Sequence, residues 1–170
     1  MPKSSLDCFI GIDPGKSGGI CFLYEGRSNN HIRAEPMPAT ERDTWLLFKN
    51  VTDNFQSCFA AIEKVHAMPG QGVTSMFTFG QNYGFLRACL IAADIPFIEV
   101  TPIRWMKALG LMTGKPNNKK RSKVSEWKNH LKNFAQNLHP KEKVTLKTAD
   151  AILIAEYCWR ERGRHGRDRR

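Results

Sequence analysis

The chain lacks any long apolar stretch and any closely spaced pair of cysteines. No run approaches the ~18 apolar residues that a membrane-crossing helix needs, and the first residues carry no apolar signal-peptide core. The five cysteines are odd in number and form no Cys-x-x-Cys pair, which argues against a structural zinc site and a disulfide framework. These absences predict a soluble protein inside a cell or one of its organelles.

Acidic residues are scarce in the second part of the chain. The 170 residues include 26 Lys and Arg against 16 Asp and Glu, a net charge of +10. Residues 1–100 hold 8 basic and 10 acidic residues, whereas residues 101–170 hold 18 and 6. This asymmetry predicts a polyanionic partner, nucleic acid first, bound mainly by the second part. Six arginines within residues 160–170 predict a flexible basic tail, either an auxiliary contact or only a solvated charge run.

The length predicts one domain over residues 1–159, because a chain near this size buries roughly 70% of its extended surface. Apolar periodicity and turn residues predict an α/β fold, a mixed sheet flanked by helices, in which the first three strands form an antiparallel meander. Strands are expected at Cys8–Ile12, Gly19–Tyr24, His31–Met37, Cys58–Val65 and Ile95–Val100, and helices at Thr40–Phe55, Thr74–Asp94, Thr101–Leu109, Lys119–Leu138 and Lys147–Arg162.

Three acidic residues stand out by their surroundings. Asp13 ends the first strand beside a glycine-rich turn, Glu63 ends the fourth strand, and Asp150 lies within an apolar helix. A buried carboxylate costs several kcal/mol unless something compensates its charge, and a bound cation does so directly. If the first and fourth strands are adjacent and parallel, Asp13 and Glu63 leave the sheet at the same end. Each acid alone has an ordinary structural reading, but their joint placement favours a site for Mg²⁺, which prefers carboxylate oxygens.

Four segments, in this order and spacing, resemble the RuvC-type Holliday junction resolvases. They are Phe9–Gly15 (FIGIDPG), Ala61–Val65 (AIEKV), Val100–Pro102 (VTP) before a lysine-bearing helix, and Ala149–Ala155 (ADAILIA). The resemblance runs from Phe9 to Tyr157. The loop after Glu63 resembles that of phage and organellar relatives more than that of the bacterial housekeeping enzyme. The expected compartment is a bacterial or phage-infected host cytoplasm, with an organelle as the alternative.

The resemblance implies an RNase H-like fold, a homodimer, and paired nicking of a four-way DNA junction that leaves 5′-phosphate and 3′-hydroxyl ends. It implies two Mg²⁺ ions per active site, with Mn²⁺ as a substitute, held by Asp13, Glu63 and Asp150. The family's fourth ligand position is occupied here by Lys147, whose ammonium cannot bind a cation. Lys147 is therefore a hypothetical contact to the scissile phosphate, and Glu156 falls on another face of the helix.

Aromatic and basic residues are the candidates for contacting DNA. The family places aromatic residues against unstacked bases after the second acid, where this chain has Phe77 and Phe79. Phe79 also fits the core face of a helix, so Phe77 is preferred. The expected DNA contacts are Gln71, Phe77, Phe79, Arg104, Lys107, Lys115, Lys119, Lys120, Arg121 and Lys123. Six phosphate contacts from the basic residues would give a salt slope of about −5 on duplex DNA.

Other functions remain open at this point. A sugar-kinase or actin-like ATPase starts with a similar hairpin, but it needs two such domains and a longer chain. Another RNase H-like nuclease, acting on RNA or on an RNA–DNA hybrid, fits the same residues. A junction-binding protein with weakened catalysis is the third alternative, because Lys147 replaces a ligand. The apolar residues of the helix Thr74–Asp94 are the expected dimer surface, by family resemblance.

Overall fold

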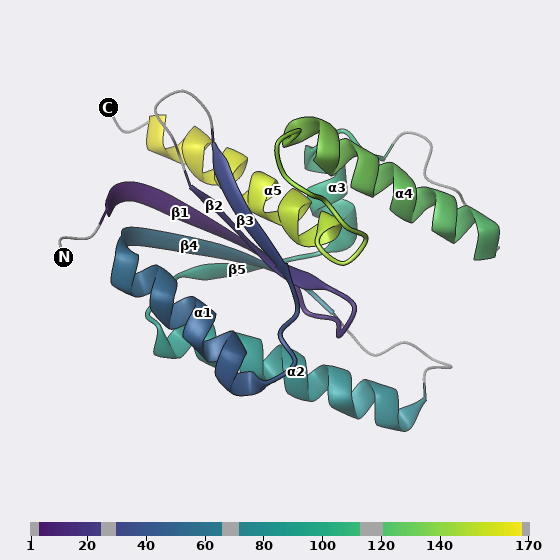
Figure 1. Ribbon diagram of the computed structural model, residues 1–170, viewed down its shortest axis with the longest axis horizontal. Helices are drawn as coiled ribbons and strands as arrows, with labels where there is room; N and C mark the ends of the chain where they lie inside the picture. Colours follow the sequence, from purple (N-terminus) through teal and green to yellow (C-terminus); the bar gives the residue numbers. More distant parts are fainter. Residues whose placement is uncertain (1–3, 25–29, 66–71, 113–120, 168–170) are drawn as a thin grey trace.

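A mixed sheet of five strands forms the centre of the molecule (Figure 1). The computed structural model describes residues 4–24, 30–65, 72–112 and 121–167. The spatial order of the strands is β3-β2-β1-β4-β5; β2 pairs antiparallel with β1 and β3, whereas β4 pairs parallel with β1 and β5. Their bounds are β1 (Ser4–Asp13), β2 (Gly19–Tyr24), β3 (His31–Pro36), β4 (Phe55–Glu63) and β5 (Phe97–Val100). The predicted sheet, a meander joined to parallel strands, is confirmed.

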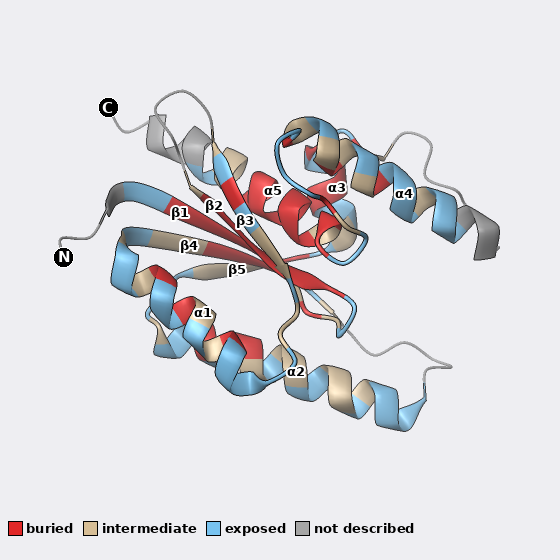
Figure 2. Ribbon diagram, viewed as in Figure 1, coloured by how far each residue is buried: buried red, intermediate tan, exposed pale blue. Residues whose placement is uncertain are grey.

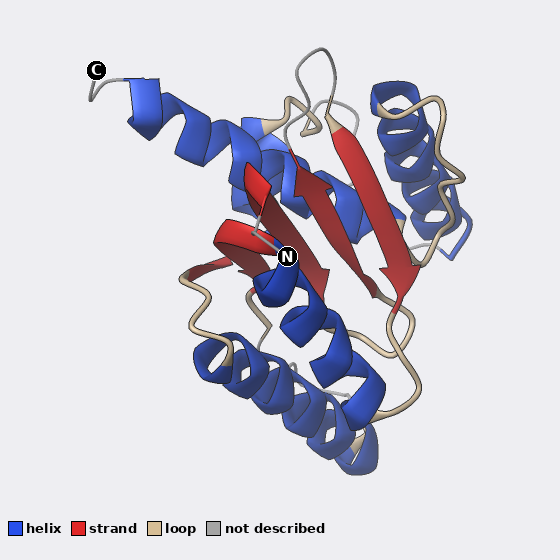
Figure 3. Ribbon diagram, turned by 60° about the vertical axis from the view of Figure 1, so that its left-hand side comes forward, coloured by secondary structure: helices blue, strands red, loops and turns tan. Residues whose placement is uncertain are grey.

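Helices cover both faces of the sheet, as Figure 3 shows. On one face lie α1 (Glu41–Asn54) and α2 (Val73–Ala92); on the other lie α3 (Pro102–Ala108), α4 (Arg121–Leu138) and α5 (Ala149–Arg167). Alternate residues of β1 point to the two faces: Ile10 packs in the cluster on the α1 and α2 side, and Phe9 in the cluster on the α5 side. The N-terminal half of α5 and the centre of the sheet are buried (Figure 2).

Two helix boundaries differ from the sequence-based expectation. Phe55, predicted as the last residue of a helix, instead begins β4 and pairs with Ser4. Its extended conformation places its ring 5.3 Å from that of Tyr24, and this packing outweighs the helical spacing of α1. The last helix begins at Ala149 and runs to Arg167, so most of the segment predicted as a tail continues α5.

Helices α2 and α3 start without a side-chain cap. Helix α2 starts at Val73 with Gly72 as its N-cap, so Thr74 and Ser75 lie inside the first turn. Thr101 is the N-cap of α3 but its hydroxyl makes no capping bond; its carbonyl oxygen accepts from the backbone N–H groups of Arg104 and Trp105 instead. Backbone geometry alone starts these helices.

The five cysteines are free thiols, four of them buried and Cys58 half-buried. In these places a thiol packs as a small apolar side chain of the core. Of the helices that the structure describes, none combines the length and the apolar character needed to cross a membrane.

Gly11 lets α5 lie directly on the central strand. A Cβ at this position would be 2.1 Å from the carbonyl oxygen of Ala151 and 2.2 Å from the backbone nitrogen of Ala155. Both partners are backbone atoms of α5, which cannot turn away as a flexible side chain can. The closeness of β1 and α5 therefore depends on the missing side chain.

Gly11→Ala is expected to lower the free energy of unfolding by about 3 kcal/mol, because the added methyl group must push α5 off the sheet. Urea denaturation measures the loss. Gly72→Ala, at the exposed N-cap of α2, is the matched control: the nearest atom to its added Cβ is Ser75 Oγ at 3.9 Å, so the variant should change the free energy of unfolding by no more than about 1 kcal/mol. Equal effects of the two substitutions would contradict this packing.

Candidate active site

Asp13 is the last residue of the central strand β1 and leads into a tight turn. The turn closes where the N–H of Gly18 donates to the carbonyl oxygen of Gly15 at 2.9 Å. A Cβ on Gly18 would lie 2.5 Å from Asp13 Cγ, so glycine is required for the turn to fold back over the acid. Burial raises the pKa of Asp13, although the N–H of Gly15 and the charge of Lys128 counteract part of this effect.

Glu63 ends the neighbouring strand at the same edge of the sheet. Strands β1 and β4 are parallel, and Ile12 pairs with Ile62, so Asp13 and Glu63 follow at equivalent positions. This adjacency was predicted from the sequence. The buried indole of Trp105, on α3, donates from Nε1 to Glu63 Oε2 at 2.8 Å. Trp105 therefore fixes the orientation of one carboxylate oxygen.

Asp150 lies in the first turn of α5, close enough to Asp13 to feel its charge. Burial is the main cause that raises the pKa of Asp150 to about 6, and repulsion by Asp13 adds to it. Lys128 opposes the shift. The two carboxylates are 137 positions apart in the sequence, and the packing of α5 on β1 brings the helix start and the strand end together.

Two residues of this site were missed from the sequence. Lys128 is exposed on α4 and lowers the pKa of both Asp13 and Asp150, so its positive charge lies near the acid pair. Trp105 appeared only as an apolar residue of a short helix. The local sequence around Trp105, which follows Pro102 by three residues, does not predict a polar partner, because the hydrogen bond to Glu63 joins residues far apart in the chain.

The acid pair fits a divalent cation. Two carboxylates that repel each other in a mostly buried place gain from a bound cation, which removes the repulsion and supplies the counter-charge. Carboxylate oxygens are the usual protein ligands of Mg²⁺. Among the residues that the structure describes, no three His, Cys, Asp or Glu side chains are gathered closely enough to form a metal centre. The fit therefore rests on Asp13 and Asp150, with Glu63 as a neighbouring carboxylate held by Trp105.

Lys147 and Glu156 were considered at or near the family's fourth ligand position. Lys147 is exposed to solvent, and Glu156 lies apart from the acid pair. Lys147 is exposed in the turn before α5, and its carbonyl oxygen lies 2.8 Å from a Cβ built on Gly19. Glu156 is buried and belongs to another cluster: Arg160 Nε donates to its Oε1 at 3.0 Å, and His139 Nε2 lies 3.7 Å from its Oε2. Burial raises the pKa of Glu156, but these two partners outweigh it and leave the pKa lowered.

The aromatic candidates differ in exposure. Phe77 is 67% exposed on α2. Phe79 is half-buried, and its Cε2 lies 3.8 Å from a Cβ built on Gly15, so its ring packs against the turn that follows Asp13. The basic candidates Arg104 and Lys107 are exposed on α3. Gln71, Lys115, Lys119 and Lys120 lie outside the described residues, and Arg121 and Lys123 are in the first turn of α4, where side chains are not described.

Comparisons with solved structures find the same fold. RuvC of T. thermophilus in complex with a Holliday junction substrate matches with a TM-score of 0.60 and 15% identity, over 96% of this chain and 97% of that one. A second structure, of Thermus thermophilus RuvC, matches with a TM-score of 0.54 and 14% identity, over 93% of this chain and 96% of that one. The yeast mitochondrial Holliday junction resolvase Ydc2 matches with a TM-score of 0.45 and 17% identity, over 99% of this chain and 84% of that one.

These matches confirm the expected RuvC-like, RNase H-like fold. The chain matches no protein-family model. It also matches no curated protein by sequence. The catalytic, metal-binding and DNA-binding roles of individual residues stay predictions.

Asp150→Asn is expected to stabilise the protein near pH 8 in the presence of EDTA. The folded pKa of Asp150 is raised from 3.8 to about 6, so its ionisation costs stability. That cost is absent below pH 3.8, grows as the pH rises, and is complete above about 6. Urea denaturation should show a gain of about 2 kcal/mol near pH 8 and none near pH 3.5. The exposed Asp7→Asn should change neither value, and an equal gain of Asp150→Asn at both pH values would contradict the buried charge.

Proposed function

We propose that the chain is a RuvC-type, structure-selective endonuclease that cleaves four-way DNA junctions by paired, metal-dependent nicks. The observation that carries the proposal is the half-buried pair Asp13 and Asp150, with Glu63 beside Asp13 at the carboxyl end of the adjacent parallel strand. The RuvC-like fold of the chain supports it. The products are 5′-phosphate and 3′-hydroxyl ends.

The acids of the site hold and orient the cation. Asp13 on β1 and Asp150 on α5 would provide two carboxylates, and Glu63 would be the neighbouring carboxylate on β4. When bound, Mg²⁺ or Mn²⁺ supplies water activation and charge neutralisation at the phosphate. Trp105 donates to one oxygen of Glu63 and so limits the rotation of this carboxylate. The positive charge of Lys128 attracts the phosphate of the scissile strand to the acid pair.

The basic surface binds the arms of the junction. Arg104 and Lys107 are exposed on α3, and Lys128 is exposed on α4. Both helices cover the same face of the sheet as α5 (Figure 1). The excess of 18 basic over 6 acidic residues in 101–170 lies in this layer and the segments joined to it. DNA bound here would reach the acid pair at the start of α5, and its affinity should fall steeply with salt.

A second copy of the chain is proposed to pack on α2. Val73 and Ile91 are exposed along one face, and Gly80 and Gly84 lie between them with open space around them. These positions follow helical spacing, and glycines allow close approach of a partner backbone. Two copies related by a two-fold axis would place one acid pair on each of two opposing strands.

Ile91→Asp is expected to convert the dimer into a monomer, because it puts a charge into the apolar contact. Sedimentation velocity at micromolar concentration measures the change. Leu46→Asp, at an exposed leucine of α1 outside this face, is the control and should leave the dimer intact. A wild-type protein that sediments as a monomer with or without junction DNA would overturn the proposed dimer.

The wild-type protein is expected to nick a four-way DNA junction in Mg²⁺ or Mn²⁺ and to spare duplex DNA, an RNA–DNA hybrid and a structured RNA. Asp13→Asn should lower the cleavage rate at least about 1000-fold while junction binding persists, since the cation loses a ligand. Asp7→Asn, at an exposed residue of the same strand, is the matched control and should cleave normally. Cleavage confined to the RNA-containing substrates would favour an RNA nuclease, and binding without cleavage in either metal would favour a junction-binding protein.

A further inference from the structure

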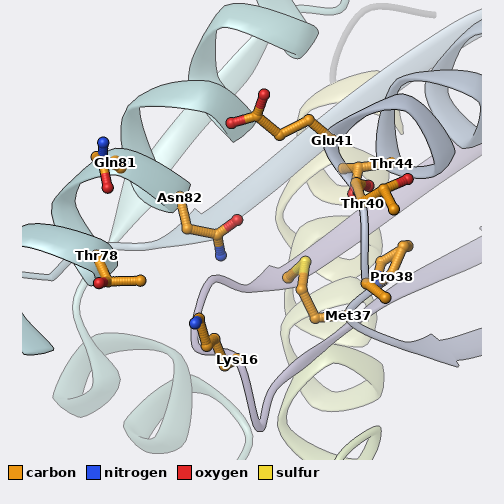
Figure 4. Close-up of a pocket in the computed structure, with 10 residues that line it drawn as sticks. Lys16, Met37, Pro38, Thr40, Glu41, Thr44, Thr78, Gln81 and Asn82 are labelled. Carbon is orange, nitrogen blue, oxygen red and sulfur yellow. The ribbon is translucent and has the colours of Figure 1, made fainter.

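A groove of about 480 Å³ opens on the far side of the turn that follows Asp13. Figure 4 shows its three walls: Lys16 from the β1–β2 turn, Met37 and Glu41 from the segment that enters α1, and Gln81 from α2. The proposed nuclease chemistry does not use this groove. Its volume is in the range of sites that take a small organic ligand.

The groove and the acid pair share one rigid wall. Lys16 is three residues beyond Asp13. The side-chain amide of Asn82 donates to the carbonyl oxygen of Pro14, and Phe79 packs near Gly15. Two residues of α2 therefore hold the turn from the groove side. Because of this, a molecule that lies in the groove has a fixed position relative to the acid pair.

Only some of the polar groups in the groove are available to a ligand. Thr40, Thr44 and Thr78 already bond to their own helices, and Asn82 is bonded to the turn. Within the part of the chain that the structure describes, the side chains of Lys16, Glu41 and Gln81 make no hydrogen bond or ion pair. Among the described residues, the open groups of the groove are thus the Lys16 ammonium, the Glu41 carboxylate, the Gln81 amide and the side-chain oxygen of Asn82.

The charged groups of the groove lie at opposite ends, the positive Lys16 at one and the negative Glu41 at the other. Lys16 lies at the end of the groove formed by the active-site turn, and Glu41 lies at the opposite end, with Met37 between them on one wall (Figure 4). A phosphate is attracted to Lys16 and repelled by Glu41. A base amino group is a suitable donor to Glu41, and the apolar side chain of Met37 can contact the face of a base.

We propose that this groove binds the nucleotide adjacent to the scissile phosphate, with its phosphate at Lys16 and its base directed to Glu41 and Gln81. The inference rests on the proposed junction cleavage, since it takes the bound strand past Asp13. A carboxylate that accepts from the base selects cytosine or adenine, which carry an exocyclic amino group, over thymine, which has none. The groove thus adds a sequence preference to an enzyme that recognises DNA structure.

The first test uses junctions that differ only in the nucleotides on either side of the cut. Wild-type protein should cleave the cytosine-containing junction about fivefold faster than the thymine-containing one at one of these positions. Glu41→Gln should abolish this difference, because an amide both donates and accepts. Lys16→Ala should slow cleavage of every junction about tenfold and reduce the salt slope of binding by about 1. Asp53→Asn and Lys49→Ala, exposed on α1 outside the groove, are the charge-matched controls and should behave as wild type.

The second test does not depend on cleavage. NMR spectra in EDTA are recorded with a deoxycytidine pentanucleotide and with a deoxythymidine pentanucleotide. The Gln81 side-chain amide and the Met37 methyl group should shift, and shift more with deoxycytidine; Lys16→Ala should weaken both responses. If wild type cleaves no junction, the proposed function fails and these shifts decide the groove alone. If it cleaves junctions while Lys16→Ala and Glu41→Gln match the controls and no shifts occur, the groove assignment is overturned and the proposed function stands.

Discussion

The contact between β1 and α5 at Gly11 is the constraint on which the acid pair depends. The strand and the helix approach until a single Cβ would overlap backbone atoms of Ala151 and Ala155. Asp13 lies two residues after Gly11, and Asp150 one residue before Ala151. Their separation is therefore set by packing of main chain on main chain. A wider gap filled by side chains would leave the two carboxylates too far apart to influence each other.

That closeness has an electrostatic cost which the surrounding residues reduce only in part. Burial raises the pKa of both Asp13 and Asp150, and their mutual repulsion adds to the shift at Asp150. Lys128 counteracts it from the surface of α4, where solvent screens its charge. Glu63, by contrast, has a buried indole donor in Trp105. Asp13 and Asp150 thus stay short of counter-charge, while Trp105 orients Glu63. This arrangement favours a bound cation over a structural ion pair.

Local patterns in the sequence were sufficient for the sheet, and they placed Asp13 and Glu63 at one edge on the condition that their strands are adjacent and parallel; Asp150 was joined to them by the family resemblance. Alternating apolar runs identified the strands, and the parallel pairing of β1 and β4 put Asp13 and Glu63 at one edge. Contacts between distant residues were not predictable in this way. Phe55 left its helix because its ring packs near Tyr24, and Trp105 reaches Glu63 across 42 positions. The nearness of Lys128 to the acids depends on how α4 lies over α5, which no spacing within α4 records.

Helix α2 joins the features that the sequence left separate. Its inward side holds the active-site turn through Asn82 and Phe79, while its outward side carries Phe77 and Ile91. These side chains are on one rigid helix of 20 residues, so a displacement of the outward face is transmitted to the turn after Asp13. A partner that packs on the outward face then also fixes the wall of the groove and the position of the first acid. The proposed pairing of two copies and the proposed cleavage site would therefore be coupled through α2.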